Sequence, residues 1–215
     1  SEQVLRKLFG KLPCEFIVTS YSAAEMLKLT CNVFHALKIS FANEVGRLGK
    51  SLGVNSREVM KLVCMDKSLN ISPVYMRPGF AYGGSCLPKD LRAMLYLAKT
   101  NDIELPVMRG IQQTNGIHIQ HAANMVMATG SREIGMVGLS FKPGTDDLRE
   151  SPNVDLARAL LREGYQLSIF DPAINANKLV GANLGYAYTQ LPALATLLIS
   201  QEVAQETRYD RIIVA

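Results

Sequence analysis

The spacing of apolar residues predicts helices throughout the first 129 residues. The segment from Ser22 to Gly53 contains no proline, opens with Ser22 and Glu25 in capping-box spacing, and ends at a glycine suited to a left-handed C-cap. This pattern predicts one long helix. Further helices are expected over 56–66, 89–100 and 105–129, the last with a weak point near Gly116.

After Gly130 the pattern alternates between strands and helices. Strand-like runs at 133–141, 165–172 and 211–215 are separated by helical runs at 153–164 and 192–205. This β-α-β-α-β order predicts a parallel sheet covered by helices, as in one half of a Rossmann fold. The fold class is therefore multidomain α and α/β. Because a complete doubly wound domain would continue past this last strand, we expect these 215 residues to be part of a longer protein.

Composition argues against nucleic-acid binding, metal binding and membrane insertion. Apolar residues make up 48% of the chain, enough for a buried core, and the net charge of +4 is not gathered in a basic block. We therefore expect no nucleic-acid partner. The four cysteines match neither a zinc knuckle nor a compact disulfide framework, so we expect no metal site. No apolar run is long enough for a membrane span, and a cytoplasmic protein is the expectation.

A polar strip is expected on the long helix. At 100° per residue, Lys28, Asn32, His35 and Asn43 fall within an arc of roughly 80°, whereas Phe34 and Leu37 lie mainly on other faces. The strip is either a ligand-facing surface or simply the solvated side of the helix. The spacing alone leaves both interpretations open.

A second candidate site surrounds Cys86 in the run MRPGFAYGGSCLPKD, residues 76–90. Gly83 and Gly84 permit backbone conformations and close approaches that other residues forbid. A cysteine just ahead of a helix beginning near Lys89 experiences the positive end of the helix and a neighbouring ammonium, and both favour the thiolate. Cys86 is thus a candidate nucleophile. The alternative is a buried structural cysteine beside a tight turn.

A third candidate site is LSFKPGTDDLRESP, residues 139–152, at the carboxyl end of the first predicted strand. Open α/β sheets place their ligands at this end, and Lys142 and Arg149 could contact phosphate or carbonyl oxygens. Alternatively, Asp146, Asp147 and Glu150 simply neutralise these cations. No G-x-G-x-x-G dinucleotide-binding motif occurs anywhere in the sequence.

Together, KLTCN with FANE, GFAYGGSCLPKD and LSFKPGTDDLRES resemble, in the same order, the signature stretches of the UDP-glucose/GDP-mannose dehydrogenase family. The resemblance implies a central helical dimerisation and catalytic domain over 1–104, a connecting helix over 105–129, and a partial C-terminal Rossmann-like sugar-nucleotide-binding domain over 130–215. It also implies that the family's N-terminal NAD-binding domain is missing from these residues.

The same resemblance implies a four-electron oxidation of a sugar C6 alcohol to a carboxylate. The alcohol passes a hydride to NAD, the Cys86 thiolate captures the aldehyde, the thiohemiacetal passes a second hydride to another NAD, and water hydrolyses the thioester. Lys28 resembles the lysine that supports alcohol deprotonation, and Asn32 the amide that holds the reacting oxygen. Asp90 resembles an aspartate that acts with water in general-base chemistry.

Substrate and cofactor contacts are implied in the same way. The loop around the sugar nucleotide, with contacts from the long helix and the C-terminal domain, would comprise His35, Asn43, Tyr75, Met76, Arg77, Pro78, Gly79, Phe80, Gly83 and Lys142. Arg77 resembles a residue lent to a neighbouring subunit, which implies a homodimer. Lys89 and Arg149 are expected on the cofactor side.

The resemblance is stronger to members that act on GDP-mannose, because of His35, Asn43 and the run from Tyr75 to Asp90. Val74 departs from the tyrosine expected beside Tyr75 in those members. UDP-glucose or another UDP-sugar is the alternative substrate. A truncated product that dimerises or binds without catalysis, and a helical scaffold with an incidental cysteine, are the alternative functions.

Overall fold

The computed structural model describes residues 2–13, 15–72, 74–75 and 79–215, and only the backbone of Val33 and His35. The predicted substrate residues Met76, Arg77 and Pro78 lie outside the described residues. The chain forms two compact units, Ser1–Asn43 and Glu44–Ala215, which we call the N-terminal and C-terminal units and describe separately. No helix among the described residues is long and apolar enough to cross a membrane.

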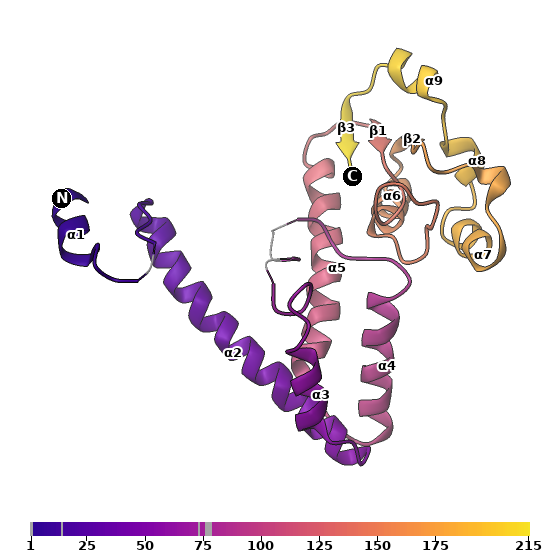
Figure 1. Cartoon of the computed structure of the whole chain (residues 1–215). Coiled ribbons are helices and arrows are strands. Elements are labelled where there is room, and N and C mark those ends of the chain that lie inside the picture. Colours follow the sequence, from indigo (N-terminus) through magenta and orange to yellow (C-terminus); the bar gives the residue numbers. More distant parts are fainter. Residues whose placement is uncertain (1, 14, 73, 76–78) are drawn as a thin grey trace. The chain divides into compact units, whose positions relative to one another are not determined.

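The N-terminal unit contains helix α1, Glu2–Phe9, and most of helix α2, Tyr21–Ser51 (Figure 1). The predicted long helix is confirmed, but its cap differs from the prediction. The Ser20 hydroxyl accepts a hydrogen bond from the Ala23 N–H at 3.2 Å, so Ser20 caps the helix in place of Ser22. Among the residues of this unit whose side chains are described, none is buried.

In the C-terminal unit, α2 ends before Gly53, whose φ of 67° is the left-handed conformation that glycine adopts without strain. Helix α3, Ser56–Val63, follows, and then helices α4, Leu87–Thr100, and α5, Pro106–Met127. Helices α4 and α5 pack against each other. Helix α5 continues through Gly116, so the predicted weak point does not interrupt it.

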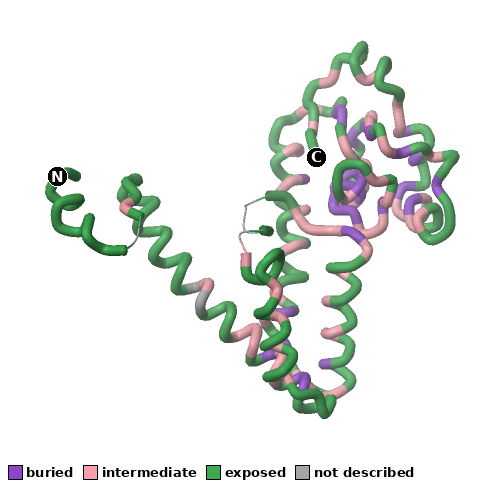
Figure 2. The backbone as a smooth tube through the Cα atoms, viewed as in Figure 1, coloured by how far each residue is buried: buried purple, intermediate pink, exposed green. Residues whose placement is uncertain are grey.

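The rest of this unit is a small parallel sheet with helices. The chain forms β1 (Glu133–Val137), α6 (Pro152–Arg162), β2 (Gln166–Phe170), η1 (Ala176–Lys178), α7 (Gly181–Gln190), α8 (Leu194–Leu197), α9 (Gln201–Glu206) and β3 (Arg211–Val214). The strand order is β2-β1-β3, and both pairings are parallel. Buried residues gather here, as Figure 2 shows. Ile134, Met136, Leu160 and Ile169 are almost inaccessible to solvent. The predicted α and α/β fold class is confirmed.

One predicted helix is wrong in detail. The run 192–205 forms two short helices, because the Ile199 N–H donates to the Ile169 carbonyl at 2.9 Å and Ser200 then caps α9. Some apolar residues of this run therefore pair with the edge of β2, and others lie in a helix. Helix α7 and the 3-10 helix η1 had no clear signal in the sequence.

Candidate functional site

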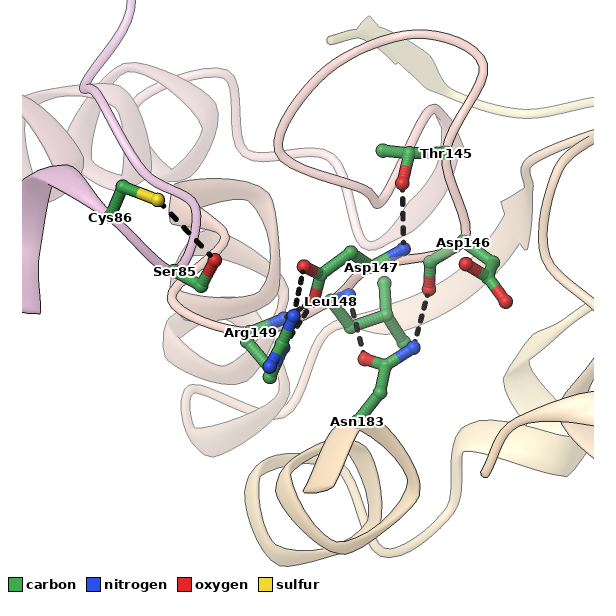
Figure 3. Close-up of polar contacts among 8 residues, drawn as sticks. All are labelled: Ser85, Cys86, Thr145, Asp146, Asp147, Leu148, Arg149 and Asn183. Carbon is green, nitrogen blue, oxygen red and sulfur yellow. Dashed lines mark hydrogen bonds and ion pairs between the residues drawn. The ribbon is translucent and has the colours of Figure 1, made fainter. Parts of the chain in front are cut away.

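Cys86 lies at the N-terminus of α4, as the sequence predicts. It is the N-cap residue, and its carbonyl accepts the Asp90 N–H at 2.9 Å. Its thiol is exposed and free, and the nearest side-chain partner is the Ser85 hydroxyl at 3.9 Å (Figure 3). Exposure argues against a buried structural cysteine. The first turn of α4 leaves N–H groups that favour negative charge at this position.

Arg149 is a cation that interacts electrostatically with Cys86. The predicted neighbour, Lys89, pairs instead with Asp90 at 3.5 Å, and both side chains are largely exposed. The pKa of Arg149 is raised, mainly by its hydrogen bond to Asp147 and the negative charge there, and to a smaller extent by the charge of Cys86. Figure 3 shows Arg149 beside the Ser85–Cys86 segment.

Arg149 is oriented by the loop after β1. Its Nε and Nη2 atoms each donate to an oxygen of Asp147 at 2.8 Å. Thr145 accepts the Asp147 N–H, and Asn183 of α7 accepts the Leu148 N–H while donating to the Asp146 carbonyl. The Arg149 hydrogen bond lowers the pKa of Asp147, which keeps this carboxylate charged. The loop thus holds a cation in a fixed direction.

The turn before Cys86 is tied to α5. The Tyr82 N–H donates to Asn115 Oδ1 at 2.9 Å, and Asn115 Nδ2 donates back to the Tyr82 carbonyl at 2.9 Å. One half-buried amide therefore satisfies both backbone groups of one residue.

The same turn is tied to the loop before α6. The Gly84 N–H donates to the Glu150 carbonyl at 3.2 Å. A side chain at Gly83 would collide with that carbonyl oxygen, so only glycine permits the approach. Glu150 has a left-handed φ of 55°, and its carboxylate forms two hydrogen bonds with Arg92 of α4, at 3.0 and 3.1 Å.

These ties surround a cavity of about 160 Å³ between α4, α5 and the N-terminus of α6. Its polar lining comes from Tyr82, Arg92, Gln112, Asn115, Glu150 and Asp155. Burial raises the pKa of Asp155, and Arg158 partly opposes that shift. Burial, followed by the negative charges of Asp155 and Glu150, raises the pKa of Tyr186 to about 12.

The other predicted site residues are spread over both units. Lys28, Asn32 and Asn43 are exposed on the N-terminal unit's part of α2, and the side chain of His35 is not described. In the C-terminal unit, Tyr75 has a left-handed φ of 63°, Gly79 and Phe80 are exposed, and Lys142 Nζ lies 5.4 Å from the centre of the Phe141 ring. The convergence of the α2 residues on Cys86 stays a prediction.

Comparison with known proteins identifies the two halves of this arrangement. Residues 22–116 match the central domain of the UDP-glucose/GDP-mannose dehydrogenase family, and residues 135–204 match the UDP binding domain of the same family. The chain belongs to this family. The turn with Cys86 lies within the first match, and the loop with Arg149 lies within the second.

Individual relatives agree with the family match. The chain is 48% identical over 200 residues to GDP-mannose 6-dehydrogenase of Pseudomonas savastanoi pv. phaseolicola, covering 93% of the chain and 46% of that protein. It is 33% identical over 183 residues to UDP-glucose 6-dehydrogenase of Rickettsia felis, covering 80% of the chain and 40% of that protein. The chain thus spans about half the length of these curated relatives.

A solved structure of a GDP-mannose dehydrogenase also resembles this chain. The crystal structure of a ternary complex of GDP-mannose dehydrogenase from Pseudomonas aeruginosa superposes with a TM-score of 0.91 at 42% identity. That match covers 99% of this chain and 49% of the other.

Sequence reasoning overlooked three residues that connect distant segments of the chain. Asn115 carried no visible signal on α5, and Glu150 was considered only as a neutralising charge. Glu44 lies within the quoted FANE motif, but it had no role assigned. Its buried carboxylate accepts the N–H groups of Val107 and Met108 at 2.7 and 3.0 Å, and so caps α5.

Proposed function

We propose that the chain is the catalytic and sugar-nucleotide-binding part of an NAD-dependent nucleotide-sugar 6-dehydrogenase that oxidises C6 of GDP-mannose to a carboxylate. The observation that carries this proposal is the exposed thiol of Cys86, the N-cap residue of α4, beside the Arg149 guanidinium (Figure 3). This environment suits a nucleophilic thiolate. Family membership supports a nucleotide sugar as the substrate class.

In the proposed reaction, Cys86 Sγ bonds to C6 at the aldehyde level, and the carbonyl oxygen takes up a proton to give a thiohemiacetal. Loss of a hydride from C6 and of the hydroxyl proton leaves a thioester. Water then cleaves the C–S bond, which releases the carboxylate and regenerates the thiol. Lys28 and Asn32 would hold the reacting oxygen, and exposed Asp90, one turn into α4, would accept a proton from the attacking water.

NAD would supply the hydride acceptor for both oxidations. Two cations fit a contact with an anionic dinucleotide: the Lys89 side chain is 65% exposed, and that of Arg149 is 41% exposed. The 215 residues contain no G-x-G-x-x-G loop to hold the pyrophosphate. Lys89 and Arg149 would therefore add contacts to NAD, and residues other than these two would form most of its binding site.

The comparisons favour GDP-mannose over UDP-glucose as the substrate. Identity is 48% to a protein named GDP-mannose 6-dehydrogenase and 33% to one named UDP-glucose 6-dehydrogenase. The described part of the predicted substrate loop, with Tyr75, Gly79 and Phe80 exposed, is accessible to a ligand. Lys142, exposed on the loop after β1, is available for an anionic group.

A binding measurement tests the substrate without requiring turnover. GDP-mannose at a hundredfold excess over its dissociation constant should stabilise the chain by roughly 2.7 kcal/mol, whereas UDP-glucose at the same concentration should give a smaller shift in melting temperature. The Cys86→Ser variant should bind GDP-mannose equally well and lose NADH formation in any preparation that turns over. Equal shifts from both nucleotides would remove the preference for GDP-mannose, and no shift from either would contradict the proposed site.

We also propose that the chain forms a homodimer through its central helices. The part of α2 in the N-terminal unit exposes large apolar side chains, among them Met26, Leu27, Leu29, Leu37 and Ile39. An apolar surface of this kind is typical of a protein interface. Sedimentation equilibrium should give twice the mass of the chain, and a monomer at all concentrations would contradict this assembly.

A further inference from the structure

The turn that carries Cys86 is held at two positions, Tyr82 and Gly84. Asn115 binds both backbone groups of Tyr82, and the Glu150 carbonyl binds the N–H of Gly84. These partners come from helix α5 and from the loop between β1 and α6, far from the turn in sequence. Two residues after Gly84 the chain reaches the thiol, so the ties restrict where the sulfur can lie.

We propose that Asn115 and Glu150 are positioning residues for Cys86, because together they fix the thiol-bearing turn against helix α5 and against the loop that carries Arg149. Neither residue contacts the thiol itself. The proposal rests on the proposed function of Cys86 as the nucleophile, and it adds the groups that place this nucleophile.

Asn115 is suited to this role by its chemistry. A side-chain amide carries one acceptor and two donors, so it can satisfy a backbone N–H and a backbone carbonyl together. Both bonds measure 2.9 Å, and Tyr82 and Asn115 are half-buried, so water competes less for these groups than on an open surface. Alanine would leave both backbone groups of Tyr82 without this partner.

Glu150 is suited to its role by its backbone. A left-handed φ of 55° is uncommon for a residue other than glycine, and it aims the carbonyl at the Gly83–Gly84 peptide. The paired hydrogen bonds between its carboxylate and Arg92 hold this conformation from the side of α4. Arg149 precedes Glu150 directly, so the loop that binds the turn also carries the guanidinium.

Amide exchange followed residue by residue by NMR tests the ties themselves. In Asn115→Ala the Tyr82 and Gly84 amides should exchange about tenfold faster than in the wild type, because the turn opens locally. In Asn115→Asp the Tyr82 amide should also lose protection, because a second carboxylate oxygen would face the Tyr82 carbonyl oxygen in place of the donor. Asn124→Ala is the matched control on the same helix, because the Asn124 side chain accepts a hydrogen bond from Gln120, and among the described residues no bond joins it to the turn; both amides should stay unchanged.

Alkylation by iodoacetamide tests the consequence for the thiol. Cys64 is also exposed and free, and serves as the reference within each sample. In Asn115→Ala the rate at Cys86 relative to Cys64 should fall about threefold, because the thiolate is the reactive species and Arg149 moves away from it. Glu150→Pro, which cannot adopt a positive φ, should give the same change, whereas Glu150→Gly, which retains the carbonyl and the left-handed backbone, should preserve the rate.

Unchanged exchange at Tyr82 and Gly84 in Asn115→Ala would overturn the proposal. An unchanged Cys86 rate in spite of faster exchange would overturn it as well, because the ties would then be structural only. The proposed function fails separately: it is contradicted if GDP-mannose does not slow alkylation of Cys86 in the wild-type protein, whatever the variants do.

Discussion

At the scale of single residues, the site depends on close approaches that only one side chain permits. Gly83 is the clearest case, since a Cβ atom there would meet the Glu150 carbonyl oxygen and lie 2.5 Å from Pro152 Cδ. Backbone and a proline ring cannot move aside as a flexible side chain can. The glycine pair in the sequence indicated a close approach, but it did not indicate the partner.

Replacing Gly83 with alanine should therefore destabilise the chain by about 1–3 kcal/mol, the typical cost of overpacking a fixed site. Urea denaturation followed by circular dichroism would measure the loss. Gly79→Ala is the matched control in the same segment, because among the described residues, its chain neighbours aside, no atom lies within 4 Å of a Cβ at Gly79. Equal stability of the two variants would show that the turn yields without strain.

The ion pair between the single residues Asp147 and Arg149 makes the stability of the folded chain depend on pH. The pKa of Asp147 is lowered in the folded chain, chiefly by the Arg149 hydrogen bond. Its contribution to stability is therefore complete above the unfolded-state pKa of about 3.9 and is lost as the pH falls through the lower folded-state value. Because the Arg149 side chain is 41% exposed, this contribution should stay below about 1 kcal/mol.

The difference in unfolding free energy between the wild type and Asp147→Asn should be constant from about pH 5 upward and shrink below about pH 4. Chemical denaturation at a series of pH values measures it. Asp146→Asn is the control, because Asn183 of α7 donates to the backbone carbonyl of Asp146 and not to its carboxylate. A difference that grows on acidification would contradict the assigned role of the pair.

At the scale of helices and strands, patterns local in the sequence predicted most of the fold. The long helix was expected over 22–53 and is observed over Tyr21–Ser51, and all three strands lie inside the predicted runs. Contacts between distant segments account for the errors. Residues 192–205 divide because Ile199 pairs with Ile169, and neither the Asn115–Tyr82 tie nor the Glu150–Gly84 tie has a local signature. The position of Cys86 was predictable because a helix N-terminus is a local feature.

The start of α5 illustrates a distant contact that determines an element. Leu105 is the N-cap and has no side-chain hydrogen bond, so Glu44 of α2, 2% exposed, supplies the missing acceptor. Glu44→Ala should cost about 1–3 kcal/mol, because hydrogen bonds to a charged acceptor are lost and two donors remain unpaired. Glu44→Gln should cost less, since its amide retains one acceptor oxygen. Urea denaturation of both variants tests this order, and equal stability of alanine and wild type would contradict it.

At the scale of the whole molecule, the two units differ in how much they bury. The C-terminal unit contains the core around β1, β2 and α6, whereas the described side chains of residues 2–13 and 15–43 include none that is buried. A segment that buries so little apolar surface gains little stability by itself. Its stability should then depend on a second copy of the chain, if the proposed homodimer covers the apolar side chains of α2.

Limited proteolysis tests this dependence. In dilute protein, trypsin should cut after Lys28 and Lys38, both exposed on α2, well before it cuts after Arg158 in α6. Raising the protein concentration should slow cleavage at the first two sites, because dimer formation orders the helix by mass action. Cleavage after Arg158 requires opening of the C-terminal unit and serves as the internal reference. If the ratio of the two cleavage rates is the same at every concentration, another partner, or none, orders α2.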